Sequence, residues 1–242
     1  MVGLEIKRTT LPKYNPIEWK DRRRFLRFLL RTIGFTLLVK LDHVEGMENI
    51  PQEGPGLLYI NHIAFVDPIV ALYVIPRDIV PMAKVEVYDY PVVGIFPRIW
   101  GVIPVRRQEF DRRAVQRALD VLHAGDIVLV APEGTRGPEL AEGKEGVAYL
   151  ASRSKVPVIP CAIQGTVGFP SLRTSVRWRE PGAKVSIGKP FRYRQDLKRP
   201  NRELLRLMTD EAMYILAAML PDNLRGFYKD LSKATNETIE WI

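Results

Sequence analysis

The architecture of the chain is clearest in one segment, which reads Gly56-Leu57-Leu58-Tyr59-Ile60-Asn61-His62-Ile63-Ala64-Phe65-Val66-Asp67-Pro68. Its first five residues form a short apolar run of the kind that buried strands have. Polar residues follow, and Pro68 is typical of a first helical turn, where its missing N–H costs nothing. The segment therefore predicts a strand over 56–60 and a helix over 68–74, with Asp67 as the N-cap.

The same alternation continues along the chain. Apolar runs predict further strands over 78–82, 102–105, 127–130, 156–163 and 183–187. Helical patterns, one of them opened by Asp111 and ended by Gly125, predict helices over 111–123, 144–153 and 202–219. Alternating strands and helices of this kind predict an α/β fold, a layered mixed sheet flanked by helices.

Composition limits the possible partners. The 242 residues are enough for one sizeable domain with an appendage, and the single cysteine, Cys161, excludes an internal disulfide. The net charge of +8 favours anionic partners. Residues 1–41 hold ten Lys or Arg against three acidic residues, so most of the surplus lies there. We expect residues 1–45 to form a basic N-terminal segment and residues 46–242 to form the main domain.

A helix is predicted from Ile17 onward, and it is amphipathic. One face carries Leu26, Leu29, Leu30, Ile33, Leu37 and Leu41, and the broadly opposite face carries Lys20, Arg24, Arg27 and Arg31. This pattern is typical of a helix that lies in a membrane interface. A surface helix packed on its own domain would have the same pattern. No stretch approaches the about 20 apolar residues of a membrane-spanning helix, and no secretory cleavage site is visible.

His62 and Asp67 form a candidate catalytic pair. A neutral imidazole can take a proton from an alcohol that attacks a carbonyl, and a carboxylate on its other nitrogen fixes the tautomer. The alternative is a loop histidine followed by a helix cap, since this spacing often arises by chance. No G-x-S-x-G elbow is present and no cysteine lies near His62, so the attacking group would be a hydroxyl of the substrate. The three histidines show no metal-ligand spacing.

A second candidate site is Pro132-Glu133-Gly134-Thr135-Arg136, which follows the predicted strand 127–130. Gly134 allows the backbone to approach an anion, Thr135 can donate a hydrogen bond, and Arg136 can hold a phosphate with two donors. Glu133 would hold a neighbouring arginine or accept from a substrate hydroxyl. The alternative is an ordinary turn with a surface arginine.

Two further basic positions follow predicted strands. Arg106 and Arg107 come after the strand over 102–105, and Lys84 comes after the strand over 78–82. These cations would add positive charge to the same pocket if the strands are neighbours. The alternative, and the commoner case, is that they are solvated side chains at strand ends.

Four blocks in this order resemble the glycerophospholipid acyltransferase family, and in particular the 1-acylglycerol-3-phosphate (lysophosphatidic acid) acyltransferases. Residues 61–67 resemble its N-H-x-x-x-x-D box, and residues 132–136 its P-E-G-T-R box. Residues 101–107 resemble the box that ends in arginine, which points to Arg107, and residues 156–160 the apolar box that closes on proline. Departures at Ala64, Ala131 and Gly137, where serine, an aromatic residue and serine are usual, bear on substrate choice.

The resemblance implies a site in which His62 is the general base and Asp67 its orienting partner. Glu133, Gly134, Thr135, Arg136, Arg107 and Lys84 would hold the phosphate of the acceptor. The acyl group would move from acyl-CoA or an acyl carrier protein to the free hydroxyl of lysophosphatidic acid, giving phosphatidic acid. The family implies no cofactor and no metal.

Other functions stay open at this level. Another lysophospholipid, glycerol-3-phosphate or an aminolipid alcohol would fit the same boxes as acceptor. A non-catalytic protein that binds anionic lipid is the alternative from another class. A nucleic-acid partner is not expected, because the basic residues lie on an amphipathic helix and no nucleic-acid-binding motif is visible. We expect a peripheral or monotopic protein on an anionic membrane surface, with its active site facing the cytoplasm.

Overall fold

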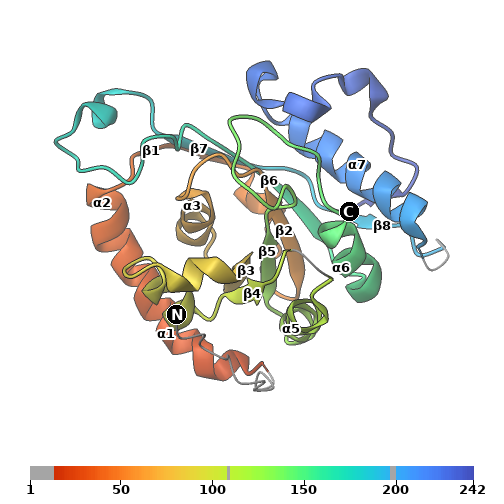
Figure 1. Cartoon of the computed structure of the whole chain (residues 1–242), viewed down its shortest axis with the longest axis horizontal. Coiled ribbons are helices and arrows are strands. Elements are labelled where there is room, and N and C mark those ends of the chain that lie inside the picture. The colour runs from red at the N-terminus through yellow and green to blue at the C-terminus, as the bar shows by residue number, and fades with distance from the viewer. Residues whose placement is uncertain (1–13, 108–109, 197–199) are drawn as a thin grey trace, which may run out of the picture.

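A central mixed sheet organises the protein, whose structure is a computed structural model that describes residues 14–107, 110–196 and 200–242. Within these ranges the strand order is β1-β7-β6-β2-β5-β3-β4, and β8 and β9 extend the sheet from β6 (Figure 1). The strands are β1 Leu41–Glu45, β2 Gly56–Ile60, β3 Ile79–Lys84, β4 Ile103–Val105, β5 Ile127–Val130, β6 Val158–Gln164, β7 Ala183–Ile187, β8 Phe191–Tyr193 and β9 Ile239–Trp241. The predicted fold class is confirmed.

The central strands are parallel, and this decides where the site lies. β2 pairs in parallel with β5 on one side and with β6 on the other, whereas β7 is antiparallel to β6. All five residues of β2 are buried. Strands that are covered on both faces have continuous apolar sequences, which is why this run could be recognised. β1, β8 and β9 were not predicted, because they are short or partly exposed and lack such a run.

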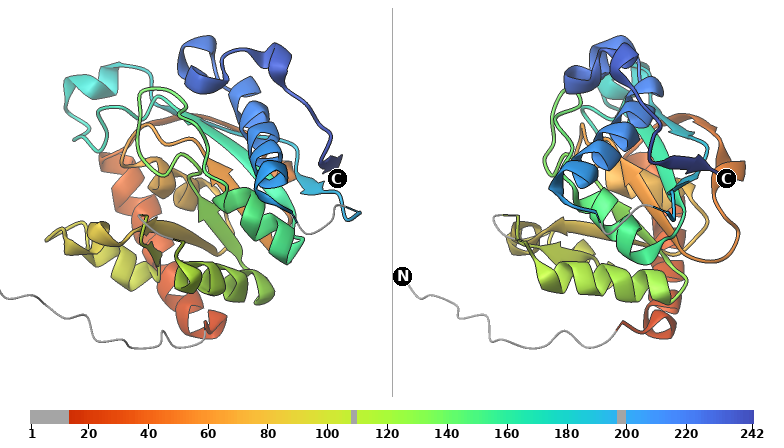
Figure 2. Two further views of the ribbon diagram at one scale, coloured as in Figure 1. Left: turned by 45° about the vertical axis from the view of Figure 1, so that its right-hand side comes forward. Right: turned by 90° about the vertical axis from the view of Figure 1, so that its right-hand side faces the viewer.

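The helices cover both faces of the sheet. They are α1 Pro16–Leu29, continued by a π-helical turn Leu30–Gly34 into α2 Phe35–Leu37, then α3 Asp67–Val74, α4 Ile95–Trp100, α5 Arg112–His123, α6 Gly146–Ser154 and α7 Arg202–Ala218. Figure 1 shows α1, α2 and α3 on one side of the strands and α5, α6 and α7 on the other. In both views of Figure 2, α1 and α7 lie on opposite sides of the sheet.

Two hydrophobic cores follow from the alternation of side chains along each strand. In β2, Leu57 and Tyr59 join the core beneath α5, α6 and α7. Leu58 and Ile60 join the core shared with α2, α3 and α4. The sheet is thus the middle layer of three, and the loops at its carboxyl edge are left for a site.

α1 is attached to the domain by two of its arginines. The Arg23 guanidinium is fully buried, donates from Nε to the Trp100 carbonyl at 3.0 Å, and lies 3.7 Å from the Asp126 carboxylate. Arg27 forms an ion pair with Asp78 at 2.5 Å. Of the four residues predicted on the basic face, Arg27 therefore has its charge paired within the protein. Lys20, Arg24 and Arg31 remain exposed.

The apolar face of the N-terminal helix is divided. Leu26 and Leu30 pack against the core, as the alternative of a domain-packed helix required. Ile33 and Leu37 stay exposed, together with Phe25 and Phe28. Among the described residues, no helix combines the length and hydrophobicity needed to cross a bilayer. Lys7, Arg8 and Lys13 of the predicted basic segment lie outside the described residues.

β1 belongs to the sheet, although residues 41–45 were predicted to be part of the N-terminal segment. It pairs in parallel with β7, and its Leu41 lies opposite Ala183. The boundary between residues 45 and 46 stays a prediction. What the structure adds is that the sheet begins before that boundary.

Candidate active site

His62 lies just beyond the carboxyl end of β2. The preceding residue, Asn61, is buried and exchanges two hydrogen bonds with the backbone of Ile163, each 2.7 Å long. Because Ile163 belongs to β6, these bonds attach the start of the loop to the neighbouring strand. The position of His62 at the edge of the sheet is fixed by this side chain, whose part was not predicted.

His62 and Asp67 are paired. Nδ1 of the imidazole lies 3.2 Å from Oδ2 of Asp67, and the carboxylate is fully buried. The His62 side chain is 16% exposed, so it reaches the surface. Among the described residues, its Nε2 has no hydrogen-bond partner. The arrangement places a carboxylate behind the ring and leaves the second nitrogen for a ligand.

Asp67 holds the backbone of the His62 loop as well as the imidazole. Its predicted role as the N-cap of α3 was wrong. α3 begins at Asp67 itself, with Val66 as its N-cap, and the carboxylate turns back to the loop. Its Oδ2 accepts from the N–H groups of Ile63 at 2.6 Å and Ala64 at 2.7 Å. Its Oδ1 accepts from the Thr166 hydroxyl at 2.5 Å. Nothing in the sequence linked Thr166 to this pair, since 99 positions separate it from Asp67.

Glu133 joins the two predicted motifs directly. Its side chain is buried; Oε1 accepts from the backbone N–H of His62 at 2.8 Å, and Oε2 accepts from that of Ala141 at 2.9 Å. Burial raises the pKa of this carboxyl above its ordinary value, and the two backbone hydrogen bonds oppose the shift. Each oxygen thus already accepts one backbone N–H, and the side chain braces the His62 loop. The predicted place of Glu133 in a phosphate site stays a prediction.

The turn at 134–137 lies against the same loop. Gly134 has a φ of 69°, a conformation that favours glycine, and its N–H donates to the Ala131 carbonyl at 3.0 Å. The N–H of Gly137 donates to the His62 carbonyl at 3.0 Å. Thr135 and Arg136 between them are exposed. Arg136 is therefore adjacent to a residue in direct contact with His62.

Arg107 belongs to the same group of charges. Burial lowers the pKa of its guanidinium below the ordinary value, Glu86 opposes this shift, and the positive charge of Arg136 lowers the pKa further. Lys84 ends β3 and lies opposite Val105 of β4, two residues before Arg107. The basic residues Lys84, Arg107 and Arg136, predicted from three separate segments, thus lie at one edge of the sheet. Cations that repel one another in this way favour the binding of an anion.

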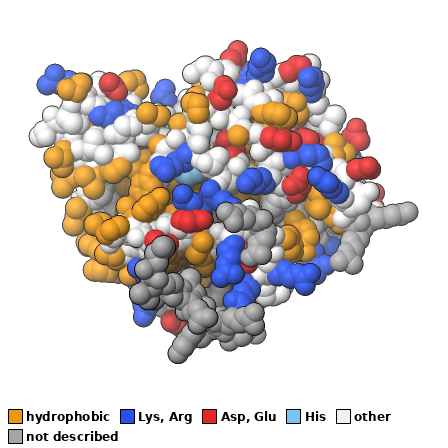
Figure 3. Space-filling model, viewed as in Figure 1, with side chains coloured by type: hydrophobic (Ala, Val, Ile, Leu, Met, Phe, Trp, Pro, Cys, Tyr) orange, Lys and Arg blue, Asp and Glu red, His pale blue; other side chains and the backbone are white. Residues whose placement is uncertain are grey.

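The surroundings of the site are shown in Figure 3. On this face a histidine is visible between Lys and Arg side chains, and hydrophobic side chains gather beside it. A surface that combines cations with an apolar area suits a ligand with a charged end and a hydrocarbon end.

Comparison with known proteins identifies the family of the chain. The family model described as Acyltransferase matches residues 43–164, about half of the chain. The chain belongs to the acyltransferase family.

Two relatives of the chain are named as acyltransferases of a particular acceptor. The chain is 28% identical over 168 residues to the 1-acyl-sn-glycerol-3-phosphate acyltransferase of Bacillus subtilis (strain 168), covering 69% of this chain and 82% of that protein. It is 29% identical over 153 residues to the chloroplastic 1-acyl-sn-glycerol-3-phosphate acyltransferase BAT2 of Brassica napus, covering 60% of this chain and 44% of that protein. The chain therefore spans less than half the length of the Brassica protein.

The fold is shared with a solved structure of this family. The crystal structure of the 1-acyl-sn-glycerophosphate (LPA) acyltransferase PlsC from Thermotoga maritima superimposes with a TM-score of 0.57, at 22% sequence identity. The match covers 90% of this chain and 81% of that one. The likeness in fold therefore covers more of this chain than the family model, which matches residues 43–164.

Other reactive groups of this acyltransferase lie away from the site or are inert. Burial raises the pKa of the Cys161 thiol to about 12, so it is a neutral side chain of the core and not a nucleophile. Among the described residues, no group of three or more His, Cys, Asp and Glu side chains is arranged to hold a metal ion. The absence of a cofactor stays a prediction.

Proposed function

We propose that this acyltransferase moves a fatty acyl group from an acyl thioester to the free hydroxyl of lysophosphatidic acid, giving phosphatidic acid. The observation that carries the proposal is the contact between the two motifs: the Glu133 carboxylate holds the N–H of His62, so a base and a basic turn share one edge of the sheet. The names of the relatives from Bacillus subtilis and Brassica napus favour the same acceptor.

His62 is the proposed general base. Its Nε2 takes the hydroxyl proton as the acceptor oxygen attacks the thioester carbonyl, and Asp67 keeps the other nitrogen protonated. A new C–O ester bond forms and the C–S bond breaks. The imidazolium then returns its proton to the departing thiolate, which leaves as the free thiol. The acceptor oxygen is the nucleophile, so no acyl-enzyme is formed.

The proposed phosphate site consists of the Arg136 and Arg107 guanidinium groups, the Thr135 hydroxyl, the backbone at Gly134 and the Lys84 ammonium. Arginine suits this role because its planar group can donate two parallel hydrogen bonds to a phosphate. Glu133 supports this site from behind, through the loop that carries His62. Binding of the phosphate there would set the position of the acceptor's hydroxyl relative to Nε2 of His62.

The acceptor and the donor are proposals within the acyltransferase chemistry. Another lysophospholipid, glycerol-3-phosphate or an aminolipid alcohol would meet the same charges. Acyl-CoA and an acyl carrier protein both present the thioester that the mechanism uses. No cofactor, metal or nucleic-acid partner is part of the proposal.

We also propose that the protein works on an anionic membrane surface, as a peripheral or monotopic enzyme whose active site faces the cytoplasm. Phe25 and Phe28 of α1 are 61% and 60% exposed. Val92, Ile95 and Ile99, in and before α4, are exposed as well, and α4 packs against α1 through the Arg23–Trp100 hydrogen bond. Figure 3 shows hydrophobic side chains over this part of the surface.

The function is tested by thiol release from acyl-CoA and from acylated carrier protein, with a panel of lysolipids, glycerol-3-phosphate and lipid alcohols. We expect release with lysophosphatidic acid. His62→Ala should reduce turnover by about 10²–10⁴-fold with the fold intact, because general-base catalysis contributes that much. Full activity of His62→Ala would reject the base. Binding to anionic vesicles without thiol release for any acceptor would favour the non-catalytic lipid-binding alternative.

A further inference from the structure

Lys144 lies in none of the motifs, yet its side chain touches one of them. A Cβ atom placed on Gly134 would lie 3.0 Å from Nζ of Lys144, 3.1 Å from Cε and 3.2 Å from Cδ. The end of the lysine side chain therefore runs across the turn of the Pro132–Arg136 motif, in the space that a side chain at position 134 would fill. The missing side chain of Gly134 lets an ammonium group lie against the turn next to Thr135 and Arg136.

The backbone that carries Lys144 is held in place. Its own N–H donates to the Pro132 carbonyl at 2.9 Å, so residue 144 is attached to the start of the motif. The N–H of the preceding Gly143 donates to the Tyr228 hydroxyl at 3.1 Å, and the Gly143 carbonyl accepts from Arg206 at 2.6 Å. These contacts determine where the side chain starts. The backbone of Lys144 is thus held more firmly than that of an ordinary lysine on a surface loop.

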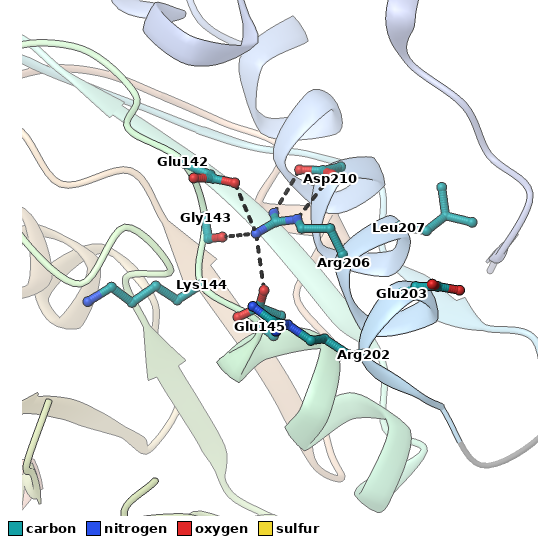
Figure 4. A pocket seen from close by; sticks show the side chains of 9 residues that line it. All are labelled: Glu142, Gly143, Lys144, Glu145, Arg202, Glu203, Arg206, Leu207 and Asp210. Atoms are coloured by element: carbon teal, nitrogen blue, oxygen red, sulfur yellow. Dashed lines mark hydrogen bonds and ion pairs between the residues drawn. The ribbon is translucent and has the colours of Figure 1, made fainter. Parts of the chain in front are cut away.

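The carboxylates near this segment belong to Arg206 and not to Lys144. Arg206 lies 2.7 Å from Asp210, 3.3 Å from Glu145 and 3.6 Å from Glu142. Figure 4 shows that the Lys144 side chain extends away from this cluster. Within the described parts of the chain, Lys144 has no ion pair. Its positive charge faces the turn without a carboxylate to neutralise it.

We infer that Lys144 is a further residue of the phosphate site, which holds the phosphate of the acceptor together with Arg136 from across Gly134. This inference rests on the proposed function for the identity of the ligand. An ammonium group without an ionic partner, beside an exposed arginine on a turn, is suited to an anion. Lys144 takes no part in bond making. Its contribution is the same in the ground state and the transition state, and it therefore affects binding of the acceptor.

The test compares Lys144→Met with the unaltered enzyme in the thiol-release assay. We expect KM for lysophosphatidic acid to rise about tenfold, while kcat and the KM of the acyl donor stay within about twofold of the unaltered enzyme. The reason is that an interaction of equal strength in the ground state and the transition state changes KM and leaves kcat the same. Lys144→Arg should restore most of the affinity, since it keeps the charge. Transfer to monoacylglycerol, which has the hydroxyl but no phosphate, should not change. An unchanged KM for lysophosphatidic acid, or a fall in kcat alone, would overturn the inference.

Lys189→Met is the matched control. Lys189 is exposed like Lys144 and has no ion pair among the residues described. It lies just before β8, which pairs with the first residue of β6. Lys189 is therefore at the opposite edge of the sheet from the candidate site. The same loss of one charge there should leave KM unchanged. A rise in KM for both variants would indicate a general effect of net charge and would also overturn the assignment.

Binding measured without turnover separates this inference from the proposed function. If the unaltered enzyme releases no thiol with any acceptor, the proposed function fails, and calorimetry with glycerol-3-phosphate decides the role of Lys144. Binding to the unaltered protein that weakens about tenfold or more in Lys144→Met supports an anion site at this turn. Equal binding by both proteins, or none by either, would reject it.

Discussion

Two buried carboxylates hold three consecutive N–H groups of the His62 loop. Glu133 accepts from His62, and Asp67 accepts from Ile63 and Ala64. Buried backbone donors need such partners, because an unpaired N–H costs about as much as a lost hydrogen bond. The spacing of four residues between the histidine and the aspartate allows the carboxylate to fold back on the loop. The acidic residues therefore set the position of the imidazole through the backbone as well as through the ring.

A substitution at Glu133 distinguishes a brace from a phosphate ligand. In Glu133→Gln the side chain keeps one acceptor oxygen, so the N–H of either His62 or Ala141 loses its partner. We expect the free energy of unfolding to fall by about 1–3 kcal/mol and kcat to fall because the His62 loop shifts. Chemical denaturation and steady-state kinetics measure the two effects. A normal kcat with a raised acceptor KM would instead restore Glu133 to the phosphate site.

At the scale of secondary structure, α1 has two functions on two sides. Its inner side places Arg23 in the protein interior, with hydrogen bonds to Trp100 and Tyr14. Its outer side exposes Phe25 and Phe28. A basic amphipathic pattern does not say which arginines pair with the domain and which stay exposed, because both kinds repeat with the same helical period.

Removal of the buried arginine should loosen this helix. Arg23→Ala leaves Asp126 without its cationic neighbour and the Trp100 carbonyl without a donor, so we expect a loss of stability of about 3 kcal/mol. Arg24→Ala, one residue further on an exposed position, is the control and should stay within about 0.5 kcal/mol of the unaltered protein. Thermal unfolding in the absence of lipid measures both. Equal effects of the two substitutions would show that Arg23 does not anchor α1.

The exposed phenylalanines of α1 should determine membrane affinity. Burial of one such ring contributes about 1.5–3 kcal/mol, so Phe25→Ser with Phe28→Ser should lower the partition coefficient onto anionic vesicles by about 100-fold or more. Phe227→Ser is the matched control, because Phe227 is 61% exposed but lies after α7, on the other side of the sheet. Vesicle sedimentation gives the result. A loss of binding only in the Phe227 variant would place the membrane contact elsewhere.

In the molecule as a whole, the parallel strands bring the charged motifs to one edge. β2 and β5 are neighbours, and their carboxyl ends lead into the His62 loop and the Pro132–Arg136 motif. The net charge of +8 adds a long-range attraction to anionic surfaces. Apolar burial and charge would thus make two separate contributions to the proposed membrane binding, and salt would affect them differently.

Salt dependence separates these two contributions. The screening length falls from about 10 Å at 0.1 M salt to about 3 Å at 1 M. We expect binding to anionic vesicles to weaken about tenfold or more over this range, and binding to neutral vesicles to change little. Equilibrium binding to vesicles of both compositions provides the measurement. A salt dependence that is the same for both would mean that the excess charge does not contribute to membrane attachment.

Local patterns predicted much of the fold. The runs at 56–60, 127–130 and 183–187 coincide with β2, β5 and β7, and Asp111 caps α5 with bonds to Arg113 and Ala114. These elements are set by neighbours in the sequence, through burial on both faces or through a cap. The short outer strands and the burial of Arg23 were not predictable, because a charged residue is assigned to the surface unless its partner is known.

The sequence alone determined the residue types and spacing of the His62–Asp67 pair and of the Pro132–Arg136 motif, because each lies within one short segment of the chain. Only the tertiary structure decided how they meet. Glu133 and His62 are 71 positions apart, and Thr166 and Asp67 are 99 apart. Lys144 reaches Gly134 across a loop that α7 and Tyr228 hold. Contacts of this kind depend on which strands become neighbours, and that order results from packing of the whole sheet.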